Sequence, residues 1–241
     1  MNLVQGFSYV TKDPKWFEKM LIGALITSVP ILEAITNGYQ LQTIRNLLKG
    51  QESPLPEWQG MDKLFGNGFR LYLAVWMIYI PAIVLEFVGW VNGLNQLFSL
   101  LFYATHADTQ TTVDINTGRY IVKIIVSALY SLLMLVLPIV FLMVPSMALR
   151  CATKNSFLET INIFAHFKFI LRNLGDYVLA KIGVLVMLFL FSLLASVVGG
   201  ITFFIVGFGG WFVLSLGRFW GRMMWAYYLA QMEISNRHLG T

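Results

Sequence analysis

Long stretches without charged residues are the feature that most constrains how this 241-residue chain can fold. Residues 87–107, 124–149 and 182–217 contain no Asp, Glu, Lys or Arg and are mostly apolar. An uncharged apolar segment of about 18 residues or more is typical of a helix that spans a membrane. The sequence therefore predicts an all-α, polytopic integral membrane protein that forms one membrane domain over residues 1–241.

The composition agrees with this prediction and argues against other classes of protein. Charged residues make up 12% of the chain, about half of the roughly 25% that a soluble domain carries. The net charge of +5 is spread over short polar segments, whereas a nucleic-acid-binding protein clusters Lys and Arg on one soluble face. We therefore expect a lipid bilayer as partner and no nucleic acid. The single cysteine, Cys151, excludes an intramolecular disulfide and a cysteine metal cluster.

The apolar segments and their interruptions predict five or six membrane-spanning helices. In the first segment, Pro30 predicts a kink or a break. The second runs over residues 69–103, too long for one straight span, and Gly89 to Gly93 favour its division into a span and a short helix. That short helix, residues 94–104, would cross only part of an apolar core about 30 Å thick. The predicted spans are residues 20–37, 69–89, 119–149, 177–198 and 210–232.

Residues 155–173 have a different pattern, because polar side chains recur on one side of an otherwise apolar helix. Ser156 and Glu159 match the S-x-x-E capping box that begins many helices. We predict one amphipathic helix that lies in the membrane interface, or docks on the membrane-facing end of the protein, and does not span. Its polar stripe, a candidate interaction surface, comprises Asn155, Glu159, Asn162, His166 and Asn173.

A weak internal repeat relates residues 13–104 to residues 119–232. Pro30-Ile31-Leu32 matches Pro138-Ile139-Val140 at an offset of 108 positions, and the same offset aligns Leu41 with Leu149. With so few identities, a true duplication and chance similarity between apolar helices both remain open.

The distribution of Lys and Arg predicts the orientation of the chain. Segments 38–70 and 150–172 are basic, while the loop 105–118 has no Lys or Arg, so both basic segments and the C-terminus should be cytoplasmic. Three lysines before the first span, Lys12, Lys15 and Lys19, also favour the cytoplasmic side, although a simple first span would place them outside. Either the segment broken at Pro30 is therefore re-entrant, or the short helix 94–104 spans after all.

Four charged residues are predicted to lie in apolar segments: Glu33, Glu86, Arg218 and Arg222. A charge near the bilayer centre costs ~3 kcal/mol or more on insertion scales, which favours a function or a partner. The functional interpretation is an ion- or proton-coupled path or a polar ligand pocket. We favour the structural one, in which a Glu–Arg pair holds two helices together or the side chains snorkel to the headgroups. The candidate partners of Glu86 are Arg218 and Arg222. Gly217 and Gly221, on the same segment as the arginines, suit close helix packing.

Sequence signatures of enzymes are missing. The chain has no H-E-x-x-H, P-loop, G-x-S-x-G or C-x-x-C motif. Its three histidines, His106, His166 and His238, do not have the spacing of metal ligands. We therefore expect no catalytic residues, no metal site and no cofactor.

A resemblance to a known family rests on two groups of residues. These are Gly38-Tyr39, Arg45, Leu55-Pro56-Glu57-Trp58, Leu64-Phe65 and Gly68, and later Asn173 with Gly175-Asp176-Tyr177. They resemble a prokaryotic membrane-protein family, the domain of unknown function numbered four thousand and thirteen. More distantly, the layout resembles the membrane domain of some glycerophosphodiester phosphodiesterases, whose soluble catalytic domain is absent here. The resemblance implies a multi-pass protein of the prokaryotic inner membrane without a settled activity.

Two classes of function remain open. The first is a membrane-embedded accessory or scaffold subunit that associates with other membrane protein subunits or forms a homo-oligomer. The second is a carrier or transporter for a lipid or a small hydrophobic solute that uses intramembrane carboxylates.

Overall fold

The computed structural model describes residues 3–51, 54–106, 136–154, 156–202 and 209–238. Within these ranges the regular secondary structure is helical, without strands, so the predicted all-α class is confirmed for the part of the chain that is described. The chain divides into two compact units. The first comprises residues 1–75 and 143–241 and the second residues 76–142, and each is described by itself.

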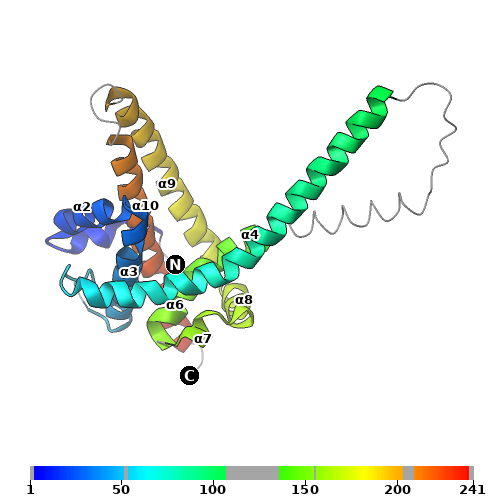
Figure 1. Cartoon of the computed structure of the whole chain (residues 1–241). Helices are drawn as coiled ribbons and strands as arrows, with labels where there is room; N and C mark the ends of the chain where they lie inside the picture. Colours follow the sequence, from blue (N-terminus) through cyan, green and yellow to red (C-terminus); the bar gives the residue numbers. More distant parts are fainter. Residues whose placement is uncertain (1–2, 52–53, 107–135, 155, 203–208, 239–241) are drawn as a thin grey trace. The chain divides into compact units, whose positions relative to one another are not determined.

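The first unit contains most of the helices (Figure 1). In chain order these are α1 (Leu3–Ser8), η1 (Val10–Lys12), α2 (Trp16–Thr27), η2 (Pro30–Leu32), α3 (Glu33–Leu48), the beginning of α4 (Met61–His106), the end of α6 (Val136–Lys154), α7 (Phe157–Thr160), α8 (Ile163–Arg172), α9 (Leu174–Thr202) and α10 (Gly209–His238).

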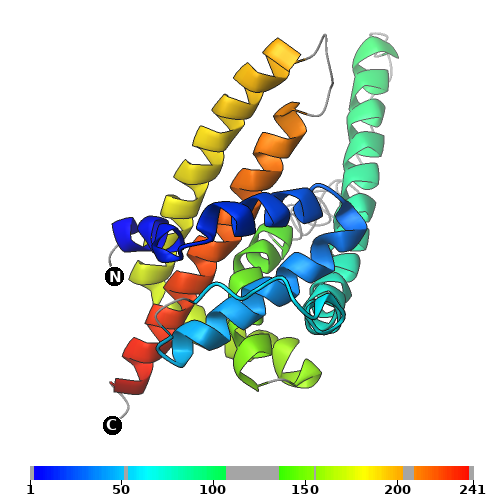
Figure 2. The ribbon, with the colours of Figure 1, turned by 90° about the vertical axis from the view of Figure 1, so that its left-hand side faces the viewer.

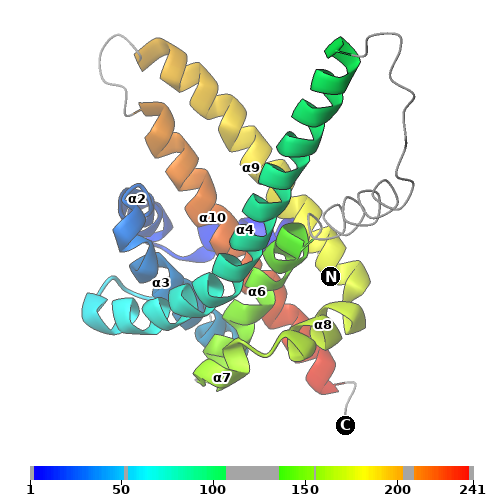
Figure 3. The same cartoon turned by 45° about the vertical axis from the view of Figure 1, so that its right-hand side comes forward.

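Helices α9 and α10 lie side by side as a hairpin, and α2 and α3 pack against α10 (Figures 2 and 3). Small residues allow the close approach of α9 and α10. A Cβ atom added at Gly217 would lie 2.5 Å from Cβ of Phe191, and one at Gly221 would lie 3.3 Å from Cγ1 of Val184. The predicted role of Gly217 and Gly221 in close helix packing is therefore confirmed.

The first predicted span is broken at Pro30. Helix α2 ends at Thr27 and α3 begins at Glu33, and Val29 between them has an extended backbone with φ −108° and ψ 112°. Proline has no N–H to donate and disfavours the helical conformation of the residue before it, which explains the break. With 12 and 16 residues, the two helices are about 18 and 24 Å long, so neither alone crosses a ~30 Å core.

The predicted division of the second apolar segment is wrong. Helix α4 runs without interruption from Met61 to His106, through Pro81 and through Gly89 and Gly93. A glycine inside a helix costs only about 1 kcal/mol relative to alanine. Asn92-Gly93, a dipeptide common in turns, does not end α4, and the helix continues through both glycines.

The prediction of one helix over residues 155–173 is also wrong, since the segment forms α7 and α8. Each of these helices has its own N-cap. The Ser156 side chain accepts from the backbone N–H of Glu159, as predicted, and the Asn162 side chain accepts from that of Ala165 at 3.1 Å. Because Asn favours capping over a place inside a helix, the chain ends α7 at Thr160 and begins again after Asn162.

One helix among the described residues is long and apolar enough to cross a membrane. This segment, Leu174–Gly199 of α9, has a mean hydropathy of 2.6. Much of the predicted span 119–149 lies outside the described residues, so the number of five or six spans stays a prediction.

Candidate functional site

A charged cluster joins α3 to α10 in the first unit. Glu33 begins α3, and Arg218 and Arg222 lie one turn apart on α10. Oε1 of Glu33 accepts from Nη2 of Arg218 at 3.0 Å and also from Nη2 of Arg222. We call these three residues the Glu33 cluster. Its geometry agrees with the structural interpretation of the sequence, in which a Glu–Arg pair holds two helices together.

Thr36 extends the Glu33 cluster by one turn of α3. Its hydroxyl donates to the carbonyl oxygen of Glu33 at 2.9 Å and accepts from Nη1 of Arg222. Arg222 and Glu33 are largely enclosed, whereas the Arg218 side chain is 45% exposed. Arg222 is therefore the fixed member of the cluster, and Arg218 is the accessible one.

The sequence suggested Arg218 or Arg222 as the partner of Glu86. Both arginines contact Glu33. The side chain of Glu86 lies outside the described part of the structure, so its partner and its role stay a prediction.

A second charged centre, which the sequence reasoning missed, surrounds Lys19 of α2. Nζ of Lys19 donates to Oδ2 of Asp13 at 2.9 Å, to the carbonyl oxygen of Leu55 at 3.0 Å, and contacts Oε1 of Glu57 at 3.0 Å. Lys19 is 4% exposed and Asp13 2%, whereas the Glu57 side chain is 54% exposed. The three N–H donors of the ammonium group thus face three acceptors. We call this arrangement the Lys19 centre.

Aromatic side chains close the Lys19 centre. Trp58 donates from Nε1 to the carbonyl oxygen of Lys19 at 3.1 Å and stacks on Tyr39 with ring centroids 4.1 Å apart. The Tyr39 hydroxyl donates to the carbonyl oxygen of Pro56 at 2.8 Å. Burial raises the pKa of Tyr39 well above its usual value, with a further contribution from the Asp13 and Glu57 carboxylates, so the hydroxyl stays protonated as a donor.

The Lys19 centre explains the first group of residues behind the family resemblance. Leu55 supplies a carbonyl oxygen and Glu57 a carboxylate to Lys19. Tyr39 donates to the carbonyl oxygen of Pro56 and stacks on the ring of Trp58. Glycines of the same group bring α3 and the beginning of α4 together. A Cβ atom on Gly38 would overlap the backbone of Leu64, and one on Gly68 would overlap the backbone of Ala34. These motif residues are the sequence signal from which the Lys19 centre could have been predicted, and they mark a site of close packing.

His166, predicted on the polar stripe, is instead fully buried. Its Nε2 lies 2.8 Å from the carbonyl oxygen of Thr160, and its Nδ1 lies 3.0 Å from Oγ of Ser146 on α6. Since a carbonyl oxygen only accepts, Nε2 carries the proton. Burial lowers the pKa of His166, the bond to Thr160 opposes this, and the nearby Arg150 guanidinium lowers the pKa further. The ring is neutral and joins α6 to α7 and α8.

The other described members of the stripe also bond within the chain. Glu159 forms a 3.0 Å ion pair with Arg150, and Asn162 caps α8. Asn173 donates to the carbonyl oxygen of Phe169 at 2.8 Å and accepts from Asn236 at 3.2 Å. Asn155 lies outside the described residues. The prediction of one continuous polar stripe on a single helix is therefore corrected, because α7 and α8 are separate helices and His166 is buried.

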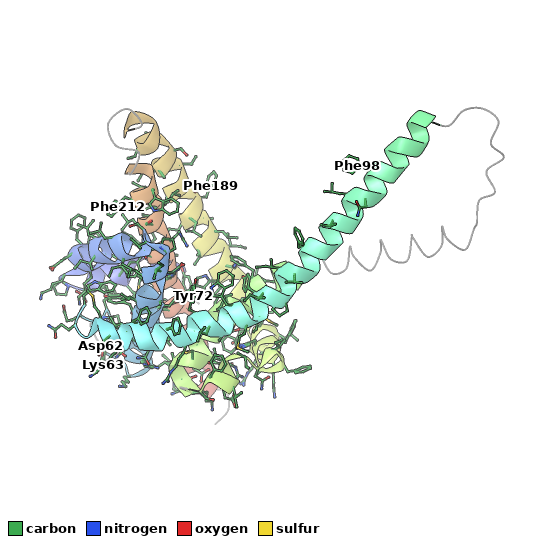
Figure 4. The ribbon with its side chains drawn as sticks, in the orientation of Figure 1. Asp62, Lys63, Tyr72, Phe98, Phe189 and Phe212 are labelled. Atoms are coloured by element: carbon green, nitrogen blue, oxygen red, sulfur yellow. The ribbon has the colours of Figure 1, made fainter. Side chains whose placement is uncertain are left out.

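Exposed apolar side chains lie on α7, α8 and α9. On α7 and α8 the exposed apolar residues are Leu158, Ile163, Phe164, Phe167 and Leu171. On α9, Phe189 is 62% exposed (Figure 4), and the exposed set continues with Val178, Leu179, Ile182, Leu185, Val186, Leu190, Leu193, Leu194 and Val197. We call the α9 set the α9 apolar face. Among the described residues, no group of three or more His, Cys, Asp or Glu side chains could hold a metal ion.

These features define a class: an all-helical protein with a helix of membrane-spanning length and with charged groups tied into internal pairs. A family model for proteins of unknown function, DUF4013, matches residues 21–204. The chain belongs to this family. No curated protein and no solved structure matches it significantly, and the more distant resemblance to glycerophosphodiester phosphodiesterases is not shown.

Proposed function

We propose that this protein is a multi-pass accessory or scaffold subunit of a prokaryotic inner membrane. It associates with other membrane protein subunits, or with further copies of itself, through helix faces embedded in the bilayer. On this proposal it contributes a surface to an assembly and performs no reaction.

The observation that carries the proposal is the distribution of polar and apolar side chains. Polar residues singled out in the sequence have partners inside the chain: Glu33 binds two arginines, Glu159 binds Arg150, and His166 is buried between α6 and α7. Apolar residues of α9 face outward over the whole of its membrane-length segment. An apolar exterior of this extent suits contact with lipid tails or with other membrane helices.

The proposed topology places segments 38–70 and 150–172 together on the cytoplasmic side. A direct contact supports their proximity, since Nε of Arg45 donates to the carbonyl oxygen of Ala152 at 3.0 Å. The contact joins the C-terminal turn of α3 to the C-terminal turn of α6, and arginine is well suited to bind the last carbonyl groups of a helix. The C-terminus, which follows Arg237 and His238 at the end of α10, is placed on the same side.

A carrier for a lipid or a small hydrophobic solute is the second candidate, and one observation favours it. The Glu33 cluster has two guanidinium groups for one carboxylate, and one of them is accessible. In such a carrier Glu33 would act as an anchor that holds the two arginines in place.

The decisive experiment measures the mass of the assembly. The full chain is purified from native membranes in a mild detergent and analysed by native mass spectrometry. We expect a stoichiometric complex above the 27.4 kDa chain mass, which Phe189→Asn dissociates. The matched control Val4→Asn, at another exposed apolar position on α1, should leave the complex intact. A 27.4 kDa monomer that carries only lipid would contradict the proposal.

A further inference from the structure

We propose that the Glu33 cluster binds a phosphate-bearing anion, held by Arg218 with support from Arg222. The first argument is the balance of charge. Both guanidinium groups contact the same oxygen, Oε1 of a single carboxylate. Among the described residues, no second carboxylate lies within ion-pair distance of either arginine, and the three side chains of the cluster together carry one positive charge. An anion brought to this point removes the repulsion between two cations on adjacent turns of one helix.

The second argument is the availability of donors. A guanidinium group has five N–H donors in a planar fork, which matches the oxygens of a phosphate in pairs. Towards the described residues, Arg218 uses Nη2 alone, in its bond to Glu33. Arg222 is held by Thr36 as well as by Glu33. With its side chain 45% exposed, Arg218 presents the remaining edge of its fork to a ligand.

The third argument is the position of the cluster along α10. Trp211, near the start of this helix, is 45% exposed and donates from Nε1 to the carbonyl oxygen of Ser28 at 3.0 Å. A partly exposed tryptophan at a helix end is typical of the membrane–water interface. Arg218 lies seven residues further, roughly 10 Å along the axis. From this depth a long arginine side chain can extend towards lipid headgroups. An anionic lipid of the leaflet near the start of α10 is one source of the phosphate, and a free phosphate is the other.

This inference does not depend on the scaffold function, because a scaffold and a carrier could both hold such an anion. It does compete with the sequence-based prediction for Glu86. If the Glu86 carboxylate supplies the missing negative charge, the cluster is already neutral and needs no external anion.

The experiment measures the thermal unfolding midpoint of the full chain in a zwitterionic detergent. Three probes are added separately: dihexanoyl phosphatidylglycerol, dihexanoyl phosphatidylcholine as a control for the acyl chains, and inorganic phosphate. We expect phosphatidylglycerol to raise the midpoint by a few degrees more than phosphatidylcholine does. A comparable rise with inorganic phosphate would identify a free phosphate as a ligand of the same site, and a rise with the lipid alone would identify the headgroup.

Variants assign the effect to the Glu33 cluster. Arg218→Gln should abolish the rise, and Arg218→Lys, which keeps the charge without the fork, should reduce it. Arg237→Gln is the matched control, because Arg237 lies on the same helix in an exposed pair with Glu233, and its response should equal that of the wild type. Glu33→Gln frees both guanidinium groups and should increase the rise, whereas a purely structural cluster gives no such increase. The proposal is overturned if no probe raises the wild-type midpoint above the phosphatidylcholine control, or if Arg218→Gln responds like the wild type.

Discussion

Replacement of Lys19 by methionine should destabilise the protein far more than any change at its exposed partner. Lys19→Met removes the ammonium group that faces Asp13, Leu55 and Glu57 but keeps most of the aliphatic stem. Asp13, 2% exposed, then loses the cation that compensates its charge. Removal of one partner of a buried ion pair typically costs 3–5 kcal/mol. Glu57 is half exposed, so Glu57→Gln should cost well under 1 kcal/mol.

A double-mutant cycle separates the ion pair from general packing. In the variant with both Asp13→Asn and Lys19→Met, the uncompensated carboxylate is gone, so the combined loss should be smaller than the sum of the single losses. The free energy of unfolding is measured by denaturant titration in detergent micelles, with tryptophan fluorescence as the signal. Trp58, bonded to the carbonyl oxygen of Lys19, is a local reporter. A Lys19→Met loss no greater than that of Glu57→Gln, or strictly additive losses, would refute this account of the centre.

Three further predictions follow from contacts in the first unit. Gly38→Ala should lower the free energy of unfolding by about 2–3 kcal/mol, because the added methyl group overlaps the Leu64 backbone. The control Gly66→Ala, with open space around its Cβ, should be neutral or stabilising by up to ~1 kcal/mol. Equal effects of the two variants in denaturant titrations would contradict the contact between Gly38 and Leu64. Since burial lowers the His166 pKa below its ordinary 6.5, the unfolded chain binds more protons than the folded chain as the pH falls through this value. The free energy of unfolding should therefore fall as the pH drops below 6.5, by at most about 1.4 kcal/mol per pH unit, and His166→Gln should remove this part of a pH titration. After Cys151 is replaced, cysteines at Lys49 and Lys154 should react with impermeant reagents from the same side of the membrane, and labelling from opposite sides would contradict the topology.

The sequence was most informative where a single residue has a strong local effect on the backbone. Pro30 predicts the break between α2 and α3 because it removes a donor and constrains the residue before it. Ser156 predicts the start of α7 for a similar reason, since its side chain replaces a missing backbone acceptor. Gly217 and Gly221 predict a close helix contact because a side chain of any size would separate the helices.

The sequence misled where several weak preferences compete. At Gly89 and Gly93 the cost of glycine is small, and α4 continues. At Asn162 the opposite occurs, because its spacing from the other polar residues predicts a place inside one helix, whereas its side chain caps a new helix. A spacing of three and four residues is compatible with one helix, but it does not exclude two short helices with an N-cap between them.

The two charged centres could not be derived from sequence spacing, because each joins elements that are far apart in the chain. The sequence predicts that Lys19 is one of the charges that favour the cytoplasmic side. A buried lysine is stable only where the fold surrounds it with acceptors, and these come from Asp13 and from residues 55–57. For Arg218 and Arg222, the sequence correctly indicates that isolated cations in an apolar segment need a partner. It offers two carboxylates, Glu33 and Glu86, and only the packing of α3 against α10 selects Glu33 for the described contacts. One carboxylate balances the charge of only one of the two guanidinium groups. The response of the unfolding midpoint to an added phosphate anion therefore tests directly whether the Glu33 cluster binds a further anion.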